Sequence, residues 1–405
     1  MTHPFSLSKP AFIAAFMVLS FSACINPASA KPYRALSILE QMPNASLAIA
    51  GDPQHSLRED KPMIPASTLK VFTALLAFKT WSPNHRFVTD FYLDNAGVLW
   101  VKGSGDPFIT SEELGQIAST LKKKGLKHIN GIGIDSHYFA ADIAIDGKSH
   151  TLNPYDAPVG ALAVNFNTVS IIRNHNQVYS GESQTPSTPL MQKLADRVPN
   201  GHHRINLGEQ SLGDRYFAEL LQAKLQKQGI KTADLIKNGH LPASGKLFYS
   251  HKNSHTLNQI VEEMLEHSNN FIANQLFLMM GAERYGSPAN ISKSQQAAAE
   301  KIRTMFGWNQ KIFHEGSGLS HKNQLSANQF IAVLEKFAPY KSLLKSQGGN
   351  ILAKTGTLTG VSSYAGYVRK AKKWTPFALF INQPVQNQFR KQLAQELLGL
   401  KSVKG

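Results

Sequence analysis

The chain has 405 residues, of which 42% are apolar, and it carries a formal net charge of +16 at pH 7. This length and apolar content allow a large hydrophobic core, which excludes a disordered or fibrous chain. The positive charge is spread out, with short clusters only at Lys122–Lys124 and Lys370–Lys373, and no nucleic-acid-binding motif accompanies it. We therefore expect no nucleic-acid partner and, at most, peripheral association with an anionic cell envelope.

The N-terminus predicts a secretion signal. Lys9 precedes an apolar run, Ala11–Ala23, which is too short to span a bilayer, and Ala28-Ser29-Ala30 has the small residues of a cleavage site. We expect cleavage near Ala30 and a periplasmic or secreted product. The only cysteine, Cys24, precedes this site, so the mature chain would have no thiol for disulfides or catalysis. Lipidation at Cys24 is the less favoured alternative.

Two blocks of predicted structure flank a mixed segment. The first block contains a strand at 46–50 and a buried helix at 69–78 that is apolar on every side except at Lys70. Strands at 87–93 and 98–101 then form a hairpin, and a helix is expected at 214–228.

The second block begins near residue 250. Its expected elements are helices at 257–265 and 271–280, three antiparallel strands at 351–358, 363–368 and 377–381, and a closing helix at 386–400. We therefore predict a signal peptide at 1–30, one domain built from 31–85 and 250–405, and an inserted domain at 86–249.

Three short motifs follow one another in a fixed order. They are Ser67-Thr68-Leu69-Lys70, Ser268-Asn269-Asn270 and Lys354-Thr355-Gly356-Thr357. This trio is typical of penicillin-binding proteins and class A β-lactamases. Each motif alone is a weak signal, because a serine and a lysine on a helix surface are common, but their joint occurrence in this order is specific.

The spacing of the first motif has a mechanical reason. Residues three apart on a helix share one face, so the Lys70 amine can reach the Ser67 hydroxyl. A serine is a poor nucleophile until a base removes its proton, and Lys70 can act as that base only if burial and a nearby cation such as Lys354 lower its pKa. We predict Ser67 as the nucleophile and Lys70 as its activating base.

The other two motifs fit substrate handling. Ser268 suits a hydroxyl relay to the leaving group, and Asn270 suits an amide that orients Lys70 or the substrate backbone. Lys354, Thr355 and Gly356 suit recognition of a peptide that ends in a carboxylate. The backbone N–H groups of Ser67 and Thr357 would form an oxyanion hole.

Further blocks make the chain resemble the D-alanyl-D-alanine carboxypeptidase/endopeptidase family, the class C low-molecular-mass penicillin-binding proteins. These blocks are Pro65–Thr68, Gly103–Pro107, Ala157-Pro158 with Asn165 and Asn167, Gly316–Ser320, Lys354–Leu358 and Tyr364–Tyr367. The resemblance implies an α/β penicillin-binding, β-lactamase-like transpeptidase fold. In this fold helices flank a five-stranded antiparallel sheet, and a large domain is inserted.

The resemblance also implies an activity. The enzyme would cleave peptidoglycan stem peptides through an acyl-Ser67 intermediate, without metal or other cofactor, and β-lactam antibiotics would acylate the same serine. Carboxypeptidase and endopeptidase action, stem-peptide side-chain preference and oligomeric state stay open. The alternatives are a β-lactamase, for which we identify no deacylating glutamate, and a non-catalytic cell-wall binding protein, for which loss of Ser67, Lys70 or Lys354 would be typical.

Spacing selects this family within the superfamily, because Ser67 and Ser268 are 201 residues apart, which leaves room for the insert. Two positions depart from the family pattern. Asn165 stands where we align an acidic residue that contacts the substrate side chain, and Glu315 replaces a commoner aspartate. His202-His203 and His314-Glu315 lack the spacing of a zinc site, so we interpret the histidines as ordinary loop residues.

Overall fold

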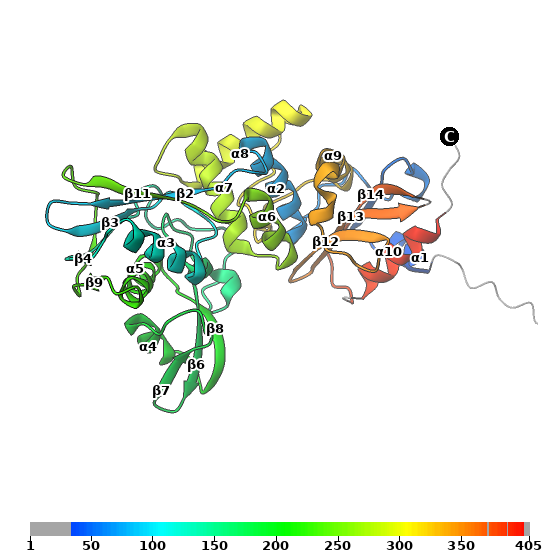
Figure 1. The fold of residues 1–405 in the computed structure, drawn as a ribbon. Helices are drawn as coiled ribbons and strands as arrows, with labels where there is room; N and C mark the ends of the chain where they lie inside the picture. The colour runs from blue at the N-terminus through cyan, green and yellow to red at the C-terminus, as the bar shows by residue number, and fades with distance from the viewer. Residues whose placement is uncertain (1–33, 371, 387, 401–405) are drawn as a thin grey trace, which may run out of the picture.

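The structure is a computed structural model that describes residues 34–370, 372–386 and 388–400. The predicted signal peptide and Cys24 lie outside the described residues. Within the described part of the chain, no helix is long and apolar enough to cross a membrane. The molecule is elongated, with an antiparallel sheet at one end, helices in the middle and a second sheet at the other end (Figure 1).

The first sheet is antiparallel and has the strand order β1-β14-β13-β12. Its strands are β1 (Ala45–Ile49), β12 (Ile351–Leu358), β13 (Val361–Lys370) and β14 (Lys373–Ile381). The sequence predicted all four strands, but the expected fifth is reduced to an isolated bridge between Leu47 and Leu57. Arg58, with φ 45°, turns the chain out of the extended conformation directly after that bridge.

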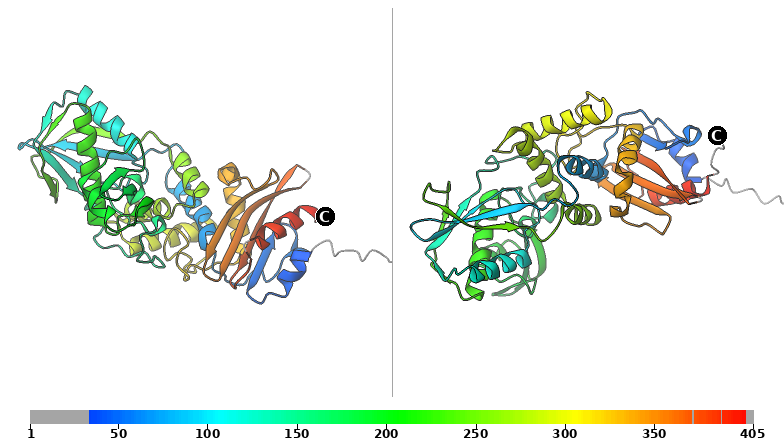
Figure 2. Two further views of the ribbon diagram at one scale, coloured as in Figure 1. Left: turned by 90° about the horizontal axis from the view of Figure 1, so that it is seen from below. Right: turned by 45° about the horizontal axis from the view of Figure 1, so that its top comes forward.

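Helices cover both faces of this sheet. Helices α1 (Arg34–Glu40) and α10 (Phe389–Gly399) pack on one face, where Leu39 and Leu393 meet Phe377 and Leu379. Helices α2 (Leu69–Thr80) and α9 (Ala327–Phe337) lie on the other face and share the central core with Phe380. Both views in Figure 2 show the sheet between these two helical layers.

The central helices position the first two sequence motifs. Helix α2 is buried along ten of its twelve residues, as its all-round apolar sequence predicted. It packs against α6 (Leu257–Glu266) and α7 (Asn270–Tyr285), and α8 (Ile291–Phe306) packs on α7. The break between α6 and α7 falls at Ser268, whose φ of 54° turns the chain sharply, so the second motif stands at a largely buried corner beside α2.

A second lobe, which we call the distal lobe, is built from the residues between Val88 and Lys252. Its main sheet is mixed and has the order β10-β5-β3-β2-β11. The strands are β2 (Val88–Leu93), β3 (Val98–Lys102), β5 (Gly131–Asp135), β10 (Ile236–Asn238) and β11 (Lys246–Lys252). Helices α3 (Ser111–Lys123) and α5 (Gln210–Lys227) pack against each other, and the distal lobe has a hydrophobic core separate from that of the central helices.

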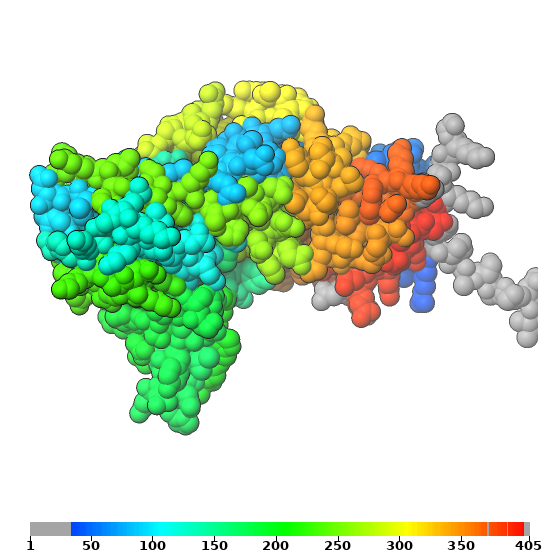
Figure 3. Space-filling model, viewed as in Figure 1, coloured from blue at the N-terminus to red at the C-terminus, as the bar shows by residue number. Residues whose placement is uncertain are grey.

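An arm of the distal lobe protrudes from the body of the molecule (Figure 3). The arm contains α4 (Pro189–Ala195) and a three-stranded sheet of β6 (Thr168–Asn174), β7 (Gln177–Ser180) and β8 (Gly201–Asn206). Elsewhere in the lobe, the short strands β4 (His128–Ile129) and β9 (Lys231–Thr232) pair with each other. His202 and His203 lie on β8, so our prediction of loop histidines was wrong. Strand β8 begins at Gly201, whose φ of 131° belongs to a turn, and the sequence of this turn resembles that of a loop.

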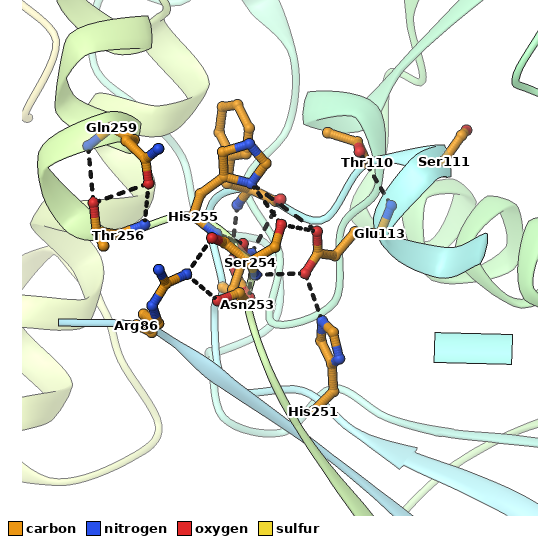
Figure 4. A network of polar contacts seen from close by, with 12 residues as sticks. Arg86, Thr110, Ser111, Glu113, His251, Asn253, Ser254, His255, Thr256 and Gln259 are labelled. Carbon is orange, nitrogen blue, oxygen red and sulfur yellow. Dashed lines mark hydrogen bonds and ion pairs between the residues drawn. The ribbon is translucent and has the colours of Figure 1, made fainter. Parts of the chain in front are cut away.

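A buried polar network joins the distal lobe to the central helices (Figure 4). Glu113 of α3 accepts hydrogen bonds from His251 Nε2 (2.7 Å), Ser254 N (2.6 Å) and Ser254 Oγ (2.6 Å). Asn253 Nδ2 donates to both carboxylate oxygens of Asp106. The Gly103–Pro107 block is thus structural, because Asp106 anchors the point where β11 returns toward α6.

Candidate active site

Ser67 lies in a tight turn that leads into α2. The turn spans Ala66–Thr68, and the φ of Ala66 is 46°. Two glycines allow the chain to pack closely here. A Cβ on Gly356 would lie 2.7 Å from Ser67 N, and a Cβ on Gly318 would lie 2.0 Å from Ala66 O. Glycine in the third motif therefore lets strand β12 lie directly against the backbone of Ser67.

Lys70 contacts the predicted nucleophile from the first turn of α2. Its Nζ lies 3.0 Å from Ser67 Oγ, and it donates to Asn270 Oδ1 and to the carbonyl of Ser317, each at 2.7 Å. The side chain is fully buried. The structure therefore brings Ser67, Lys70 and Asn270 together, as the motif spacing predicted.

The surroundings of Lys70 favour its neutral amine. Burial lowers the pKa of Lys70 well below its ordinary value, the positive charge of Lys354 lowers it further, and only the charge of Glu315 opposes the shift. A neutral amine has two N–H bonds and one lone pair. Because Asn270 and Ser317 can take the two N–H bonds, the lone pair is free for the hydroxyl proton of Ser67.

Glu315 organises the turn that supplies the Ser317 carbonyl. Its buried carboxylate accepts hydrogen bonds from the backbone N–H groups of Ser317 (2.8 Å) and Gly318 (2.7 Å) and from Asn323 Nδ2 (2.7 Å). Sequence reasoning treated this residue as a neutral departure and missed this role. A charged residue directly before a Gly-Ser-Gly turn was the available signal, since such a residue can cap the turn's N–H groups.

The other two motifs meet across the opening. Lys354 Nζ donates to Ser268 Oγ and to the carbonyl of Thr355, each at 2.9 Å. Burial lowers the pKa of Lys354 to about 8, and the charge of Arg390 contributes to the shift. Lys354 is therefore largely protonated at pH 7 and can supply a cation beside Lys70, whose pKa burial also lowers.

Arg390 of α10 is a second residue that sequence reasoning missed. One of its terminal nitrogens donates to the carbonyl of Gly356 (2.8 Å) and to Thr357 Oγ1 (2.9 Å). It thereby fixes the strand segment that faces Ser67. No motif marks this arginine, because α10 reaches β12 only through the folding of the C-terminus.

Three residues named in the sequence analysis make contacts that the sequence did not predict. Thr355 contributes its carbonyl to Lys354, and the Thr357 hydroxyl is engaged by Arg390. Asn165 is buried, and its side chain exchanges hydrogen bonds with Ser111 N and Ser111 Oγ, both at 2.9 Å. It therefore holds the start of α3, and its side chain is engaged inside the distal lobe, where the aligned family position has an acidic residue near the substrate side chain.

Comparisons with known proteins establish the family of the chain. The family model of the D-Ala-D-Ala carboxypeptidase 3 (S13) family matches residues 46–197, 209–348 and 341–400. The chain belongs to this family. It is therefore a serine-type D-alanyl-D-alanine carboxypeptidase, a hydrolase, as its sequence predicted.

Relatives and solved structures cover most of the chain. The D-alanyl-D-alanine carboxypeptidase DacB of Haemophilus influenzae is 26% identical over 390 residues, which cover 79% of this chain and 80% of DacB. A crystal structure of penicillin-binding protein 4 (dacB) from that organism has a TM-score of 0.73 at 22% identity and covers 90% and 98% of the two chains. A second crystal structure, with a bound β-lactam, has a TM-score of 0.68 at 23% identity, with the same coverage.

A more distant structure has a different reported role. Bd3459, a predatory peptidoglycan endopeptidase from Bdellovibrio bacteriovorus, has a TM-score of 0.50 at 16% identity and covers 87% of this chain and 90% of its own. These structural matches show the fold. They confirm the predicted α/β fold class of penicillin-binding proteins with its large insertion.

Proposed function

We propose that Ser67 is the nucleophile and Lys70 the general base of this D-Ala-D-Ala peptidase. The observation that carries the proposal is the position of the buried Lys70 amine, 3.0 Å from Ser67 Oγ with two carbonyl oxygens as its other partners. Lys70 takes the hydroxyl proton while Ser67 Oγ attacks the carbonyl carbon of the penultimate D-Ala. The oxygen of that carbonyl becomes an oxyanion, which the N–H groups of Ser67 and Thr357 stabilise.

Ser268 and Lys354 complete the step. The Ser268 hydroxyl relays the proton that Lys70 took to the amide nitrogen of the leaving D-Ala. The C–N bond then breaks and D-Ala departs, which leaves an ester on Ser67 and a neutral Lys70. Protonated Lys354, with the Thr355 hydroxyl, holds the terminal carboxylate, while Gly356 leaves room for the substrate against β12. A water molecule then attacks the ester, with Lys70 again as the base, and Ser67 is regenerated.

We propose peptidoglycan stem peptides as substrates and β-lactam antibiotics as ligands of the same serine. The support is family membership together with the β-lactam bound in the H. influenzae structure. The product of signal cleavage near Ala30 would act in the periplasm or outside the cell, and the charge of +16 suits peripheral contact with an anionic envelope.

We also propose the domain boundaries that the sequence indicated, with 31–85 and 250–405 as the peptidase domain and 86–249 as the insert. The separate core of the distal lobe supports this division. The insert also contributes to the site, because Asn270 Nδ2 donates to the carbonyl of Tyr155 (3.1 Å).

The test is release of D-alanine from a stem pentapeptide. We expect the purified mature chain to release D-alanine and Ser67→Ala to release none. Thr73→Ser, on the same helix, is not a suitable control, because the Thr73 hydroxyl donates to the Gly316 carbonyl. The control is Lys79→Met, at the exposed end of α2, which should retain activity. Equal activity of the wild type and Ser67→Ala would refute the assignment of the nucleophile.

Endopeptidase action is the second candidate, since it breaks the same class of D-Ala carbonyl bond, and Bd3459 shares the fold. Assaying a cross-linked stem-peptide dimer beside the pentapeptide separates the two. Cleavage of the dimer would add endopeptidase activity to the carboxypeptidase activity, whereas an intact dimer would limit the enzyme to carboxypeptidase action.

A further inference from the structure

A cluster of metal-ligating side chains lies outside the active site, at the end of strand β5 in the distal lobe. Asp135, His137 and His240 each offer one ligand atom, and these atoms all lie within 4.8 Å of one another. Asp135 is buried, whereas both histidines are exposed. The peptidase mechanism uses none of these three residues.

The fold brings the three residues together from distant parts of the chain. Asp135 ends β5, His137 follows it by two residues, and His240 follows β10, which pairs in parallel with β5. Because neighbouring parallel strands end on the same side of a sheet, the segment that follows β5 and the segment that follows β10 meet there. His137 and His240 stack with their ring centroids 3.5 Å apart and their planes at 18°.

The hydrogen bonds of Asp135 orient its carboxylate toward the imidazoles. Its Oδ2 accepts from Leu241 N (2.9 Å), which leaves Oδ1 directed at His137 Nδ1, also at 2.9 Å.

We propose that Asp135, His137 and His240 bind one divalent transition-metal ion, with zinc as the best-matched chemistry. Two imidazoles and a carboxylate form a ligand set that zinc uses, with water in the fourth position. Neighbouring ligand atoms in a tetrahedral zinc site lie roughly 3.3 Å apart, given zinc–ligand distances of about 2.0 Å. Asp135 Oδ1 and His137 Nδ1 are 2.9 Å apart, and all three ligand atoms lie within 4.8 Å of one another, so the two exposed imidazoles have to turn toward the carboxylate to close the site around an ion.

The position of the site indicates what the ion does. After His137 the chain crosses to the central helices, where Ala289 N donates to the Tyr138 carbonyl (2.8 Å) and Ala140 N donates to the Ala289 carbonyl (2.9 Å). An ion bound by both His137 and His240 would link the crossing segment after His137 to the segment that follows β10. Binding would therefore stabilise the folded distal lobe without touching the nucleophile.

The test is calorimetric titration of Zn²⁺ into the mature chain, prepared without a histidine tag and treated with a chelator. We expect one Zn²⁺ per chain, and at least about tenfold weaker binding for His137→Ala and for His240→Ala. The matched control is His128→Ala, which removes another exposed histidine of the same lobe and should leave binding unchanged. Zinc should also raise the melting temperature of the wild type more than that of His240→Ala.

Absence of Zn²⁺ binding, or equal binding by the wild type, His240→Ala and His128→Ala, would overturn the site. Each variant is first melted without metal, and a variant that has lost its cooperative transition is replaced by His240→Gln, a milder change on an exposed loop. Penicillin acylation of every variant is measured in parallel and should match the wild type. The zinc proposal can therefore fail while the proposed function stands.

Discussion

The active site and the junction of the two lobes both bury charged side chains, but they treat the charge differently. At the junction, Glu113 is surrounded by three donors, and hydrogen bonds from His251 and Ser254 outweigh its burial and lower its pKa. In the active site, two lysines lie close together and burial lowers the pKa of both. At the junction the surroundings of Glu113 stabilise its charged form, whereas in the active site the surroundings of the two lysines destabilise their charged forms, as the proposed role of Lys70 as a base requires.

The junction is not uniform, since burial raises the pKa of Asp106 to about 6 in spite of its bonds to Asn253. Asp106 nevertheless has a hydrogen-bond donor at both carboxylate oxygens. Lys70, in contrast, donates to the neutral oxygens of Asn270 and Ser317 and to no carboxylate among the described residues. The comparison indicates that stability and activity are divided between the two regions. Variants can test that division.

The largest effect is expected for Lys70→Met. Removal of the general base should slow acylation by a fluorescent penicillin by about 10³-fold, while the folded structure is kept because methionine fits a buried position. The measurement is the second-order acylation rate, with Lys79→Met as the control from the exposed end of the same helix. A rate within tenfold of the wild type would assign the base to another group.

Glu113→Ala should cost stability and not chemistry. It leaves buried donors of His251 and Ser254 without an acceptor, which should lower the free energy of unfolding by about 2–5 kcal/mol. Urea denaturation measures this loss, and Glu112→Ala, the exposed neighbour on α3, should cost less than about 1 kcal/mol. An equal loss in the two variants would mean that the buried network contributes nothing special.

Lys354→Met should show the opposite pattern. At pH 7 it removes a buried cation, so the free energy of unfolding should rise by about 1–3 kcal/mol, while stem-peptide binding is lost. The unfolded wild type binds more protons than the folded one between about pH 8 and the ordinary lysine value of 10.5, so wild-type stability rises with pH there. The advantage of the variant should therefore shrink across that window. A variant less stable than the wild type at pH 7 would contradict the account.

The smallest effect concerns acid. Because the pKa of Glu113 in the folded state lies below its ordinary value of 4.5, its contribution is fully present above that pH. This contribution is lost as the pH falls through the folded-state pKa. Glu113→Gln should therefore lose less stability than the wild type between pH 5 and pH 3. Parallel denaturation curves over this range would show that the carboxylate is not stabilised in the folded state.

The sequence predicted the elements that carry local signals. The all-round apolar pattern around Lys70 predicted α2, the segments at 351–358, 363–368 and 377–381 predicted three strands of the first sheet, and the motif spacing predicted the contact of Lys70 with Ser67. The shortened sheet edge was not predictable, because it depends on the backbone turn at Arg58.

Contacts between distant segments were missed for the same reason. Arg390 reaches β12 from the C-terminal helix, and no local pattern announces such a contact. His137 and His240 are 103 residues apart, so our search for closely spaced histidines could not find them. Their proximity comes from the parallel pairing of β5 and β10.

The most direct test of the central claim is mass spectrometry of the intact mature chain after incubation with benzylpenicillin, followed by peptide mapping. The account predicts one covalently bound penicillin per chain, located on Ser67, and no adduct in Ser67→Ala. An adduct on another residue, or an adduct that persists in Ser67→Ala, would contradict it.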